Sequence, residues 1–211
     1  MTRKLEGPWF ESHSSRFMIH SSRLTFHESR FTFHASRITH HVSRFNMRER
    51  KEPIPAAAVA FVRDAEQGIE VYLSRRPAHF RYYPDAFVFP GGRVDSDDAD
   101  IRATAAREVR EEIGIEIDTD RLVLLRNINT SAHAGPVYHM QTFAYPVVGD
   151  FITTPNVEEV EEEIWITARE AVRLDLPYQI RAAIFTIAKF ESVARLLEAL
   201  HEGSIDEDYW F

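Results

Sequence analysis

The 211-residue sequence contains no cysteine, no long apolar run and no surplus of positive charge. Without cysteine the chain can form neither disulfides nor thiolate zinc sites and has no Cys nucleophile, and this absence fits a reducing compartment. No uninterrupted apolar run approaches the roughly 18 residues of a membrane-spanning helix. With 25 Lys+Arg against 33 Asp+Glu, the formal net charge is -8. That balance argues against bulk binding to nucleic acid or anionic membranes, and we expect a cytoplasmic protein with neither as a partner.

Residues 1–46 form a seven-residue repeat that differs in charge from the rest of the chain. The unit Ser-Arg-apolar begins at residues 15, 22, 29, 36 and 43, and histidine recurs at the same spacing. This segment has a net charge of +4, which leaves -12 for residues 47–211. Its apolar residues lie two apart, as in Phe17 and Ile19, rather than three and four apart. The period therefore does not fit a coiled-coil seam.

The repeat permits three interpretations: a histidine metal array, a transit peptide, or the translation of a tandem DNA repeat of seven codons. We favour the last, because histidine recurs only as part of the whole unit and Met47 follows the last unit. We therefore expect residues 1–46 to be disordered and dispensable, as an overextended gene start, and residues 47–211 to form the functional domain. An intact-mass measurement of the native protein tests this, and a mature chain that retains residues 1–46 contradicts it.

After residue 47, short apolar runs separated by turn signals predict a mixed sheet with helices. Strands are expected at 55–63, 69–75, 86–90, 121–128, 137–148 and 160–166. Helices are expected at about 101–113, stopped by Gly114, and over 167–173. Apolar residues at three- and four-residue steps predict one final helix from about Ile180 to Leu200, with Asp175 as a cap and Pro177 in its first turn. This order favours an α+β or α/β sandwich with a single core.

The predicted helix 101–113 concentrates acidic side chains on one side. Glu108 and Glu112 are four residues apart, and Glu111 is three from Glu108, so the three carboxylates lie together. Like charges this close destabilise an isolated helix, whereas Mg²⁺ or Mn²⁺ prefers such oxygen ligands. The acids thus indicate a metal site. A solvated acidic helix balanced by neighbouring arginines is the alternative.

The stretch from Gly92 to Ile115 resembles the Nudix box, Gly-x5-Glu-x7-Arg-Glu-U-x-Glu-Glu-x-Gly-U, where U is a bulky aliphatic residue. Its second half matches at every fixed position: Arg107, Glu108, Val109, Glu111, Glu112, Gly114 and Ile115. The first half departs, because Asp98 replaces the first Glu and eight residues rather than seven separate it from Arg107. The chain is similar to the Nudix hydrolase superfamily, and the similarity extends more loosely over roughly residues 54–200.

The resemblance implies an α/β/α sandwich with a mixed sheet and a catalytic loop-helix-loop. It also implies a diphosphatase that uses Mg²⁺ or Mn²⁺ to hydrolyse a nucleoside diphosphate derivative, namely CoA or acyl-CoA, ADP-ribose or a nucleotide sugar. Carried over residue by residue, Glu108, Glu111 and Glu112 are expected to bind metal, with Glu111 or Glu112 as base. Gly92 is expected to offer a carbonyl near the metal, and Arg107 to pair with an acid of the box and fix the helix to the loop.

Further metal and catalytic candidates lie in the acidic run 158–163. Relatives in the superfamily often recruit an extra metal ligand or a general base from this region. Glu159 is our candidate for the ligand and Glu162 for the base. Solvated loop and edge-strand charge is the alternative for both.

Residues 73–95 are similar to the coenzyme A diphosphatase branch of the superfamily. Tyr83 and Asp85 occupy the positions of the His-x-Gly pair of that branch, so the signature is incomplete. The basic residues of this stretch that could contact substrate phosphates are Arg75, Arg76 and Arg81. A surface role is the alternative for each of them.

The leading prediction is therefore a metal-dependent hydrolase, monomeric or homodimeric, whose substrate is a nucleotide-derived small molecule. A non-catalytic Nudix-fold domain that senses a nucleotide is one alternative, and a structural acidic domain is another. The complete half-motif from Arg107 to Ile115 favours the enzyme, since a sensor does not need all three carboxylates.

Overall fold

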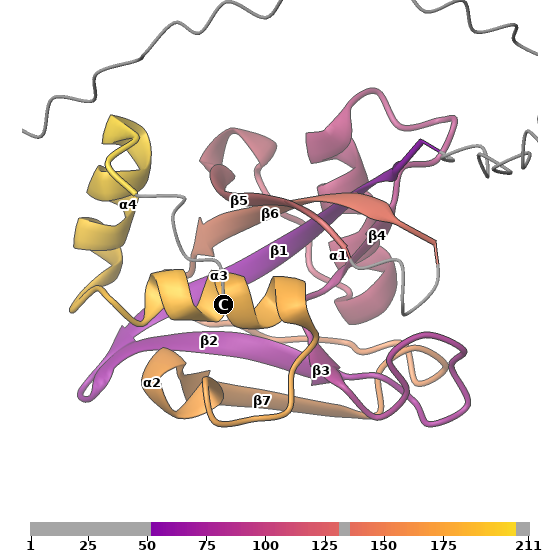
Figure 1. Ribbon diagram of the computed structural model, residues 1–211. Coiled ribbons are helices and arrows are strands. Elements are labelled where there is room, and N and C mark those ends of the chain that lie inside the picture. The colour runs from indigo at the N-terminus through magenta and orange to yellow at the C-terminus, as the bar shows by residue number, and fades with distance from the viewer. Residues whose placement is uncertain (1–51, 131–135, 206–211) are drawn as a thin grey trace, which may run out of the picture. The chain divides into compact units, whose positions relative to one another are not determined.

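The computed structural model describes residues 52–130 and 136–205. The repeat of residues 1–46 and the expected domain start at Met47 lie outside the described residues. Within those ranges the chain forms a seven-stranded mixed sheet covered by helices on both faces (Figure 1). The predicted α+β sandwich with a mixed sheet is confirmed.

The sheet is built on a long hairpin of β1 (Ile54–Ala65) and β2 (Gly68–Arg75). Strand β2 has two further antiparallel partners, β3 (Phe87–Val88) and β7 (Glu162–Thr167). Strand β1 pairs in parallel with β6 (Tyr138–Pro146), and β6 pairs antiparallel with β5 (Val123–Asn129). The start of β1 also pairs with the short strand β4 (Gly91–Arg93). This last pairing places the Gly-Gly turn of the box against the centre of the sheet.

The strand predicted at 86–90 is wrong in part, because the chain changes partners within it. Phe87 and Val88 pair with β2, whereas the residues from Gly91 onward pair with β1. Pro90 has no N–H to donate to a ladder, and Gly91 has φ +156, which a residue with a side chain rarely adopts. Together they turn the chain out of one pairing and into the other.

Both faces of β1 are buried, as its unbroken apolar run predicts. Ala57, Val59 and Phe61 belong to a core cluster shared with α1 (Ile101–Ile113). The alternate residues Ala58, Ala60 and Val62 belong to a second cluster shared with α3 (Tyr178–Ile187) and α4 (Val193–Glu202). Because successive strand residues point to opposite faces, the helices α1 and α3 lie on opposite sides of the sheet (Figure 1).

The prediction of one final helix is wrong, because the structure has two, α3 and α4. Apolar periodicity continues across the break and conceals it. Ser192 caps the N-terminus of α4 by accepting a hydrogen bond from the N–H of Arg195, and Asp64 accepts one from the N–H of Val193. These polar partners start a new helix in a new direction.

Asp175 does not cap α3, which begins after Pro177 without a side-chain cap, and the Asp175 carboxylate instead lies 3.5 Å from Arg181. Ahead of it, α2 (Ala168–Ala171) is shorter than the predicted helix 167–173. None of the described helices is long and apolar enough to cross a bilayer.

Candidate active site

Helix α1 is fixed at both ends by residues of the sequence motif. Asp100 accepts hydrogen bonds from the first free N–H groups of the helix, and Gly114 ends it with φ 71. Val109 and Ile113 are fully buried against the sheet. The carboxylates of the remaining faces can therefore be presented towards the loop before the helix.

The Gly-Gly turn lies against two of those carboxylates. A Cβ atom on Gly92 would lie 2.4 Å from Oε1 of Glu108, so only glycine permits this approach. The N–H of Gly91 donates to Oε2 of Glu112 at 3.3 Å. A Cβ on Gly91 would lie 2.2 Å from the carbonyl oxygen of Ala57. The two glycines therefore serve different needs: Gly91 makes room for the sheet, and Gly92 makes room for Glu108.

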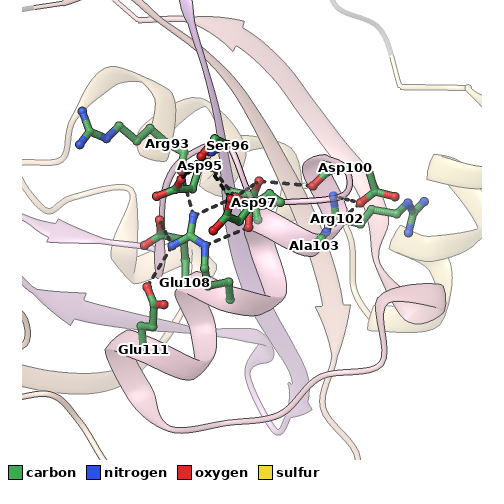
Figure 2. Close-up of polar contacts among 12 residues, drawn as sticks. Arg93, Asp95, Ser96, Asp97, Asp100, Arg102, Ala103, Glu108 and Glu111 are labelled. Carbon is green, nitrogen blue, oxygen red and sulfur yellow. Dashed lines mark hydrogen bonds and ion pairs between the residues drawn. The ribbon is translucent and has the colours of Figure 1, made fainter.

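Arg107 is the hub that joins α1 to the loop. Its Nη1 donates to Glu108 at 2.8 Å and to Glu111 at 2.9 Å, and its Nη2 donates to the carbonyl oxygen of Arg93 at 3.1 Å. Figure 2 shows Glu108 and Glu111 below the loop that carries Asp97. The expected pairing of Arg107 with acids of the box is present.

Asp98 completes this hub. Both of its carboxylate oxygens accept hydrogen bonds from Arg107, each at 2.9 Å, and it also accepts from Thr104 Oγ1 and from the N–H of Asp95, each at 2.8 Å. Bonding to Arg107 holds the pKa of Asp98 well below its usual range. Despite the shorter acid and the longer loop, Asp98 closes the same arginine–acid bridge. With both oxygens occupied, it acts as a clamp of the loop.

Glu112 is a buried carboxylate with little to stabilise its charge. The residue is 7% exposed. Burial raises its pKa well above the usual value, and the nearby charges of Glu108 and Glu159 raise it further, while Arg76 and the Gly91 N–H act in the opposite direction. Burial also raises the pKa of Glu108, although the hydrogen bond and the charge of Arg107 act to lower it. These acids form a cluster with excess negative charge.

Glu159 reaches the cluster from a distant part of the sequence. The N–H of Asn156 donates to the carbonyl oxygen of Glu112 at 2.8 Å, which satisfies a free acceptor in the last turn of α1. The N–H of Glu159 then donates to the carbonyl oxygen of Asn156 at 2.9 Å. The end of α1 therefore positions the turn that carries Glu159.

The donor chemistry of this cluster fits a divalent cation. All candidate ligands are oxygen atoms, which Mg²⁺ and Mn²⁺ prefer, and burial raises the pKa of Glu112 despite the nearby charge of Arg76. Among the described residues no three acidic or histidine side chains already form a ligand set. Oε1 of Glu108 and Oε2 of Glu111 each accept a hydrogen bond from Arg107.

The three candidate arginines lie in different surroundings. Arg75 donates to Glu162 at 2.8 Å and also lies near Glu161 and Asp85, so its charge is matched away from the cluster. This pairing also occupies Glu162, which is exposed at the start of β7. Arg81 is exposed, with its guanidinium 5.3 Å from the ring of Tyr82.

Arg76 is the one of these three that faces the carboxylates. Its guanidinium lies 4.4 Å from the ring centre of Phe80. Burial lowers its pKa, and the charges of Glu112 and Glu159 oppose that effect. Its Nε is buried and has no hydrogen-bond partner among the described residues. The side chain is therefore a half-buried cation beside the acidic cluster with a donor to spare.

The two residues that replace the His-x-Gly pair share an unusual backbone conformation. Tyr83 has φ 53 and Asp85 has φ 56, both in the left-handed region that favours glycine. Both residues therefore hold a backbone conformation that glycine would adopt without strain.

A cavity of about 180 Å³ opens beside the Gly-Gly turn. Its walls include Arg76 and Tyr83, together with residues that the sequence did not single out, namely Tyr82, Arg93, Thr130, Tyr138 and Gln179. The one signal available for Gln179 was a polar residue on the apolar row of the last predicted helix. A larger cavity of about 500 Å³, lined by Arg126, Tyr178 and Phe185, contains no residue of the box. Of these two cavities, the smaller is the one that adjoins the Gly-Gly turn of the box.

Comparisons with known proteins agree with this geometry. The model of the NUDIX domain matches residues 53–186. The chain is 42% identical over 60 residues to an uncharacterized Nudix hydrolase NudL of Enterobacter sp. (strain 638), covering 28% of this chain and 30% of that protein. It is 32% identical over 104 residues to the peroxisomal coenzyme A diphosphatase ndx-8 of Caenorhabditis elegans, covering 49% of this chain and 44% of that protein.

The fold is also found in solved structures. The crystal structure of a NUDIX hydrolase from Alicyclobacillus acidocaldarius matches with a TM-score of 0.59 at 18% identity, covering 71% of this chain and 96% of that one. An acidic helix anchored to a glycine turn in an α/β/α sandwich thus defines the class of protein. The chain belongs to the NUDIX family. The matched stretches span less than half the length of these two curated relatives.

Proposed function

We propose that this protein is a metal-dependent hydrolase that cleaves the diphosphate linkage of a nucleoside diphosphate derivative. The observation that carries the proposal is the buried Glu112 carboxylate, flanked by Glu108 and Glu159 and held beside the Gly-Gly turn. Burial of a carboxylate without a bonded cation of its own destabilises the folded protein, and Glu112 has only the N–H of Gly91 as a hydrogen-bond donor among the described residues. Its retention is explained if a cation and a polyanionic substrate complete the site.

Glu108 and Glu112 would hold Mg²⁺ or Mn²⁺, with Glu111, Glu159 and the carbonyl group of Gly92 as further oxygen ligands. A bound cation supplies neutralisation of the diphosphate charge and a lower pKa for the attacking water. Its positive charge also reverses the burial effect that raises the pKa of Glu112.

The remaining residues orient the reaction. Arg107 and Asp98 would hold the loop and the helix together, because Arg107 donates to Asp98 and to the carbonyl oxygen of Arg93. Arg76 can donate its free N–H groups to a phosphate oxygen. Glu111, whose side chain is 48% exposed, can accept the proton of the attacking water, and Glu112 or Glu162 is the alternative base.

For the substrate, we place CoA or acyl-CoA first and ADP-ribose or a nucleotide sugar next. The similarity to a coenzyme A diphosphatase supports this order. The incomplete His-x-Gly signature keeps the other nucleotide derivatives in consideration.

A hydrolysis screen over CoA, NADH, ADP-ribose, nucleotide sugars and dinucleoside polyphosphates, with and without Mg²⁺ or Mn²⁺, tests the proposal. The double variant Glu111→Gln/Glu112→Gln is expected to lose at least about 100-fold in kcat, because one or more charged ligands are removed. Glu66→Gln, an exposed acid in the β1–β2 turn, is the matched control and is expected to retain full activity.

Thermal unfolding separates the possible failures. Mn²⁺ is expected to raise the melting temperature of the wild type and not that of the double variant, since only the native cluster binds it. Undiminished hydrolysis in a folded double variant refutes the site assignment. Metal and nucleotide binding without any hydrolysis favours a nucleotide-sensing domain instead.

A further inference from the structure

Two residues that line the cavity beside the Gly-Gly turn each have a buried polar atom without a hydrogen-bond partner among the described residues. Gln179, in the first turn of α3, is 6% exposed, and its Oε1 has no hydrogen-bond partner. Nε of Arg76 is likewise buried and unpartnered, and both side chains line this cavity. Unsatisfied buried polar atoms cost free energy, so two in one cavity indicate that a bound molecule satisfies them.

The folding of α3 does not require the amide of Gln179. The residue is next to Ile180 and one turn before Ala183, both of them buried in the core. Thr186, another buried polar residue of the same helix, is satisfied locally, because its Oγ1 donates to the carbonyl oxygen of Ala182 at 3.2 Å. An apolar side chain would serve packing at position 179 better than an unsatisfied amide.

The cavity suits one arm of a substrate rather than a whole nucleotide. Its volume of about 180 Å³ is below the roughly 300–1,000 Å³ of pockets that enclose complete ligands. Its walls are mainly apolar and include Val88, Phe89, Met140 and Ile180. Arg76 lines the cavity, and while burial lowers its pKa, the charges of Glu112 and Glu159 oppose that effect, so the cavity and the acidic cluster share this residue.

The two free atoms offer one donor and one acceptor, which is the complement of a carboxamide. A carboxamide presents an N–H donor and a carbonyl acceptor on a flat group, whereas a sugar ring presents several hydroxyl groups that each need a partner. We infer that the cavity binds a carboxamide in the part of the substrate that lies beyond its adenosine diphosphate. Gln179 accepts its N–H and Arg76 donates to its oxygen, so Gln179 determines specificity. This inference rests on the proposed function.

Two substrate sources share this chemistry: the acyclic amide arm of CoA and the carboxamide on the nicotinamide ring of NADH. The test measures kcat and KM of the full-length protein for CoA, NADH and ADP-ribose, with wild type and Gln179→Met. We expect the wild type to prefer an amide substrate. Gln179→Met should lower kcat/KM for that substrate about 10- to 100-fold, mainly through KM, and change ADP-ribose less than about twofold. Loss on CoA identifies the acyclic arm, and loss on NADH identifies the ring.

Thr186→Val is the matched control, because it removes a buried polar group of the same helix that the protein itself satisfies. It is expected to leave the ratio of the three kcat/KM values unchanged, and Gln179→Met is expected to melt at or above the wild-type temperature. An equal loss on all three substrates, no loss on any, or a wild-type preference for ADP-ribose overturns the inference.

If the wild type hydrolyses none of the three, the proposed function fails and the inference is tested by binding. Calorimetric titration with CoA and NADH should then show affinity in the wild type that is at least about 10-fold weaker in Gln179→Met. Equal affinity in the two proteins, or no binding of either compound, overturns the carboxamide site.

Discussion

Two arginines on either side of the acidic cluster illustrate two uses of the same side chain. Arg107, in α1, donates to Asp98, Glu108, Glu111 and the carbonyl oxygen of Arg93. Arg76, at the end of β2, is half-buried with an Nε that has no partner among the described residues. The first arginine is saturated by its own protein, and the second is not.

This difference in hydrogen bonding distinguishes residues that hold the fold together from residues that are available to bind a ligand. Charge-assisted hydrogen bonds made within the protein hold the loop and the helix together, whatever is bound. A buried donor without a partner contributes nothing to folding and gains its partner only from a ligand. By the same criterion Asp98 belongs with the scaffold, and Gln179 belongs with the binding surface.

The largest effect is expected at the two glycines. Gly91→Ala should lower the free energy of unfolding by about 3 kcal/mol or more, because its Cβ would meet the backbone of β1 and φ is +156. Gly92→Ala should cost much less stability, because its Cβ meets only the Glu108 carboxylate, yet it should impair metal-dependent hydrolysis. Urea unfolding and activity measured on both variants check this. Similar losses in the free energy of unfolding for the two variants would contradict the different roles assigned to Gly91 and Gly92.

The next effect tests the two arginines directly. Arg107→Met should lower the free energy of unfolding by about 2 kcal/mol, because it leaves Asp98, only 6% exposed in its side chain, without its partner. Arg76→Met should leave stability unchanged or raise it by up to about 1 kcal/mol, since the guanidinium is desolvated and incompletely bonded. Its kcat/KM should fall. The comparison fails if Arg76→Met destabilises the protein as much as Arg107→Met does.

The smallest effect is a pH dependence in the scaffold. The pKa of Asp98 is lowered in the folded state, so its stabilisation is complete above the unfolded value of 3.8 and is lost as the pH falls through the folded pKa. Asp98→Asn should therefore cost about 1 kcal/mol at pH 7 and progressively less below about pH 4. The matched control Asp97→Asn, in the exposed loop, should show no such trend. If the difference in free energy of unfolding between the wild type and Asp98→Asn stays constant from pH 7 to pH 3, Asp98 does not hold the loop through its charge.

Local patterns in the sequence predicted α1, its Gly114 stop, the hairpin of β1 and β2, and the acids that gather on the helix. Each depends on neighbours within a few residues, which is why pattern is sufficient. The break between α3 and α4 was missed because apolar periodicity continues through it, while the capping bond from Val193 goes to Asp64, far away in the sequence. The partner change at Pro90 was missed for the same reason, since pairing depends on which distant strand is free.

For the candidate site, the spacing of the box was enough to single out Glu108, Glu111 and Glu112, because three- and four-residue steps on a helix fix which side chains lie together. Only the tertiary structure decided the rest. It brought Asp98 onto Arg107 across a lengthened loop, and it paired Arg75 with Glu162. It also left Arg76 and Gln179 unsatisfied in one cavity. Burial and hydrogen-bond saturation arise from contacts between distant segments, and no local pattern contains them.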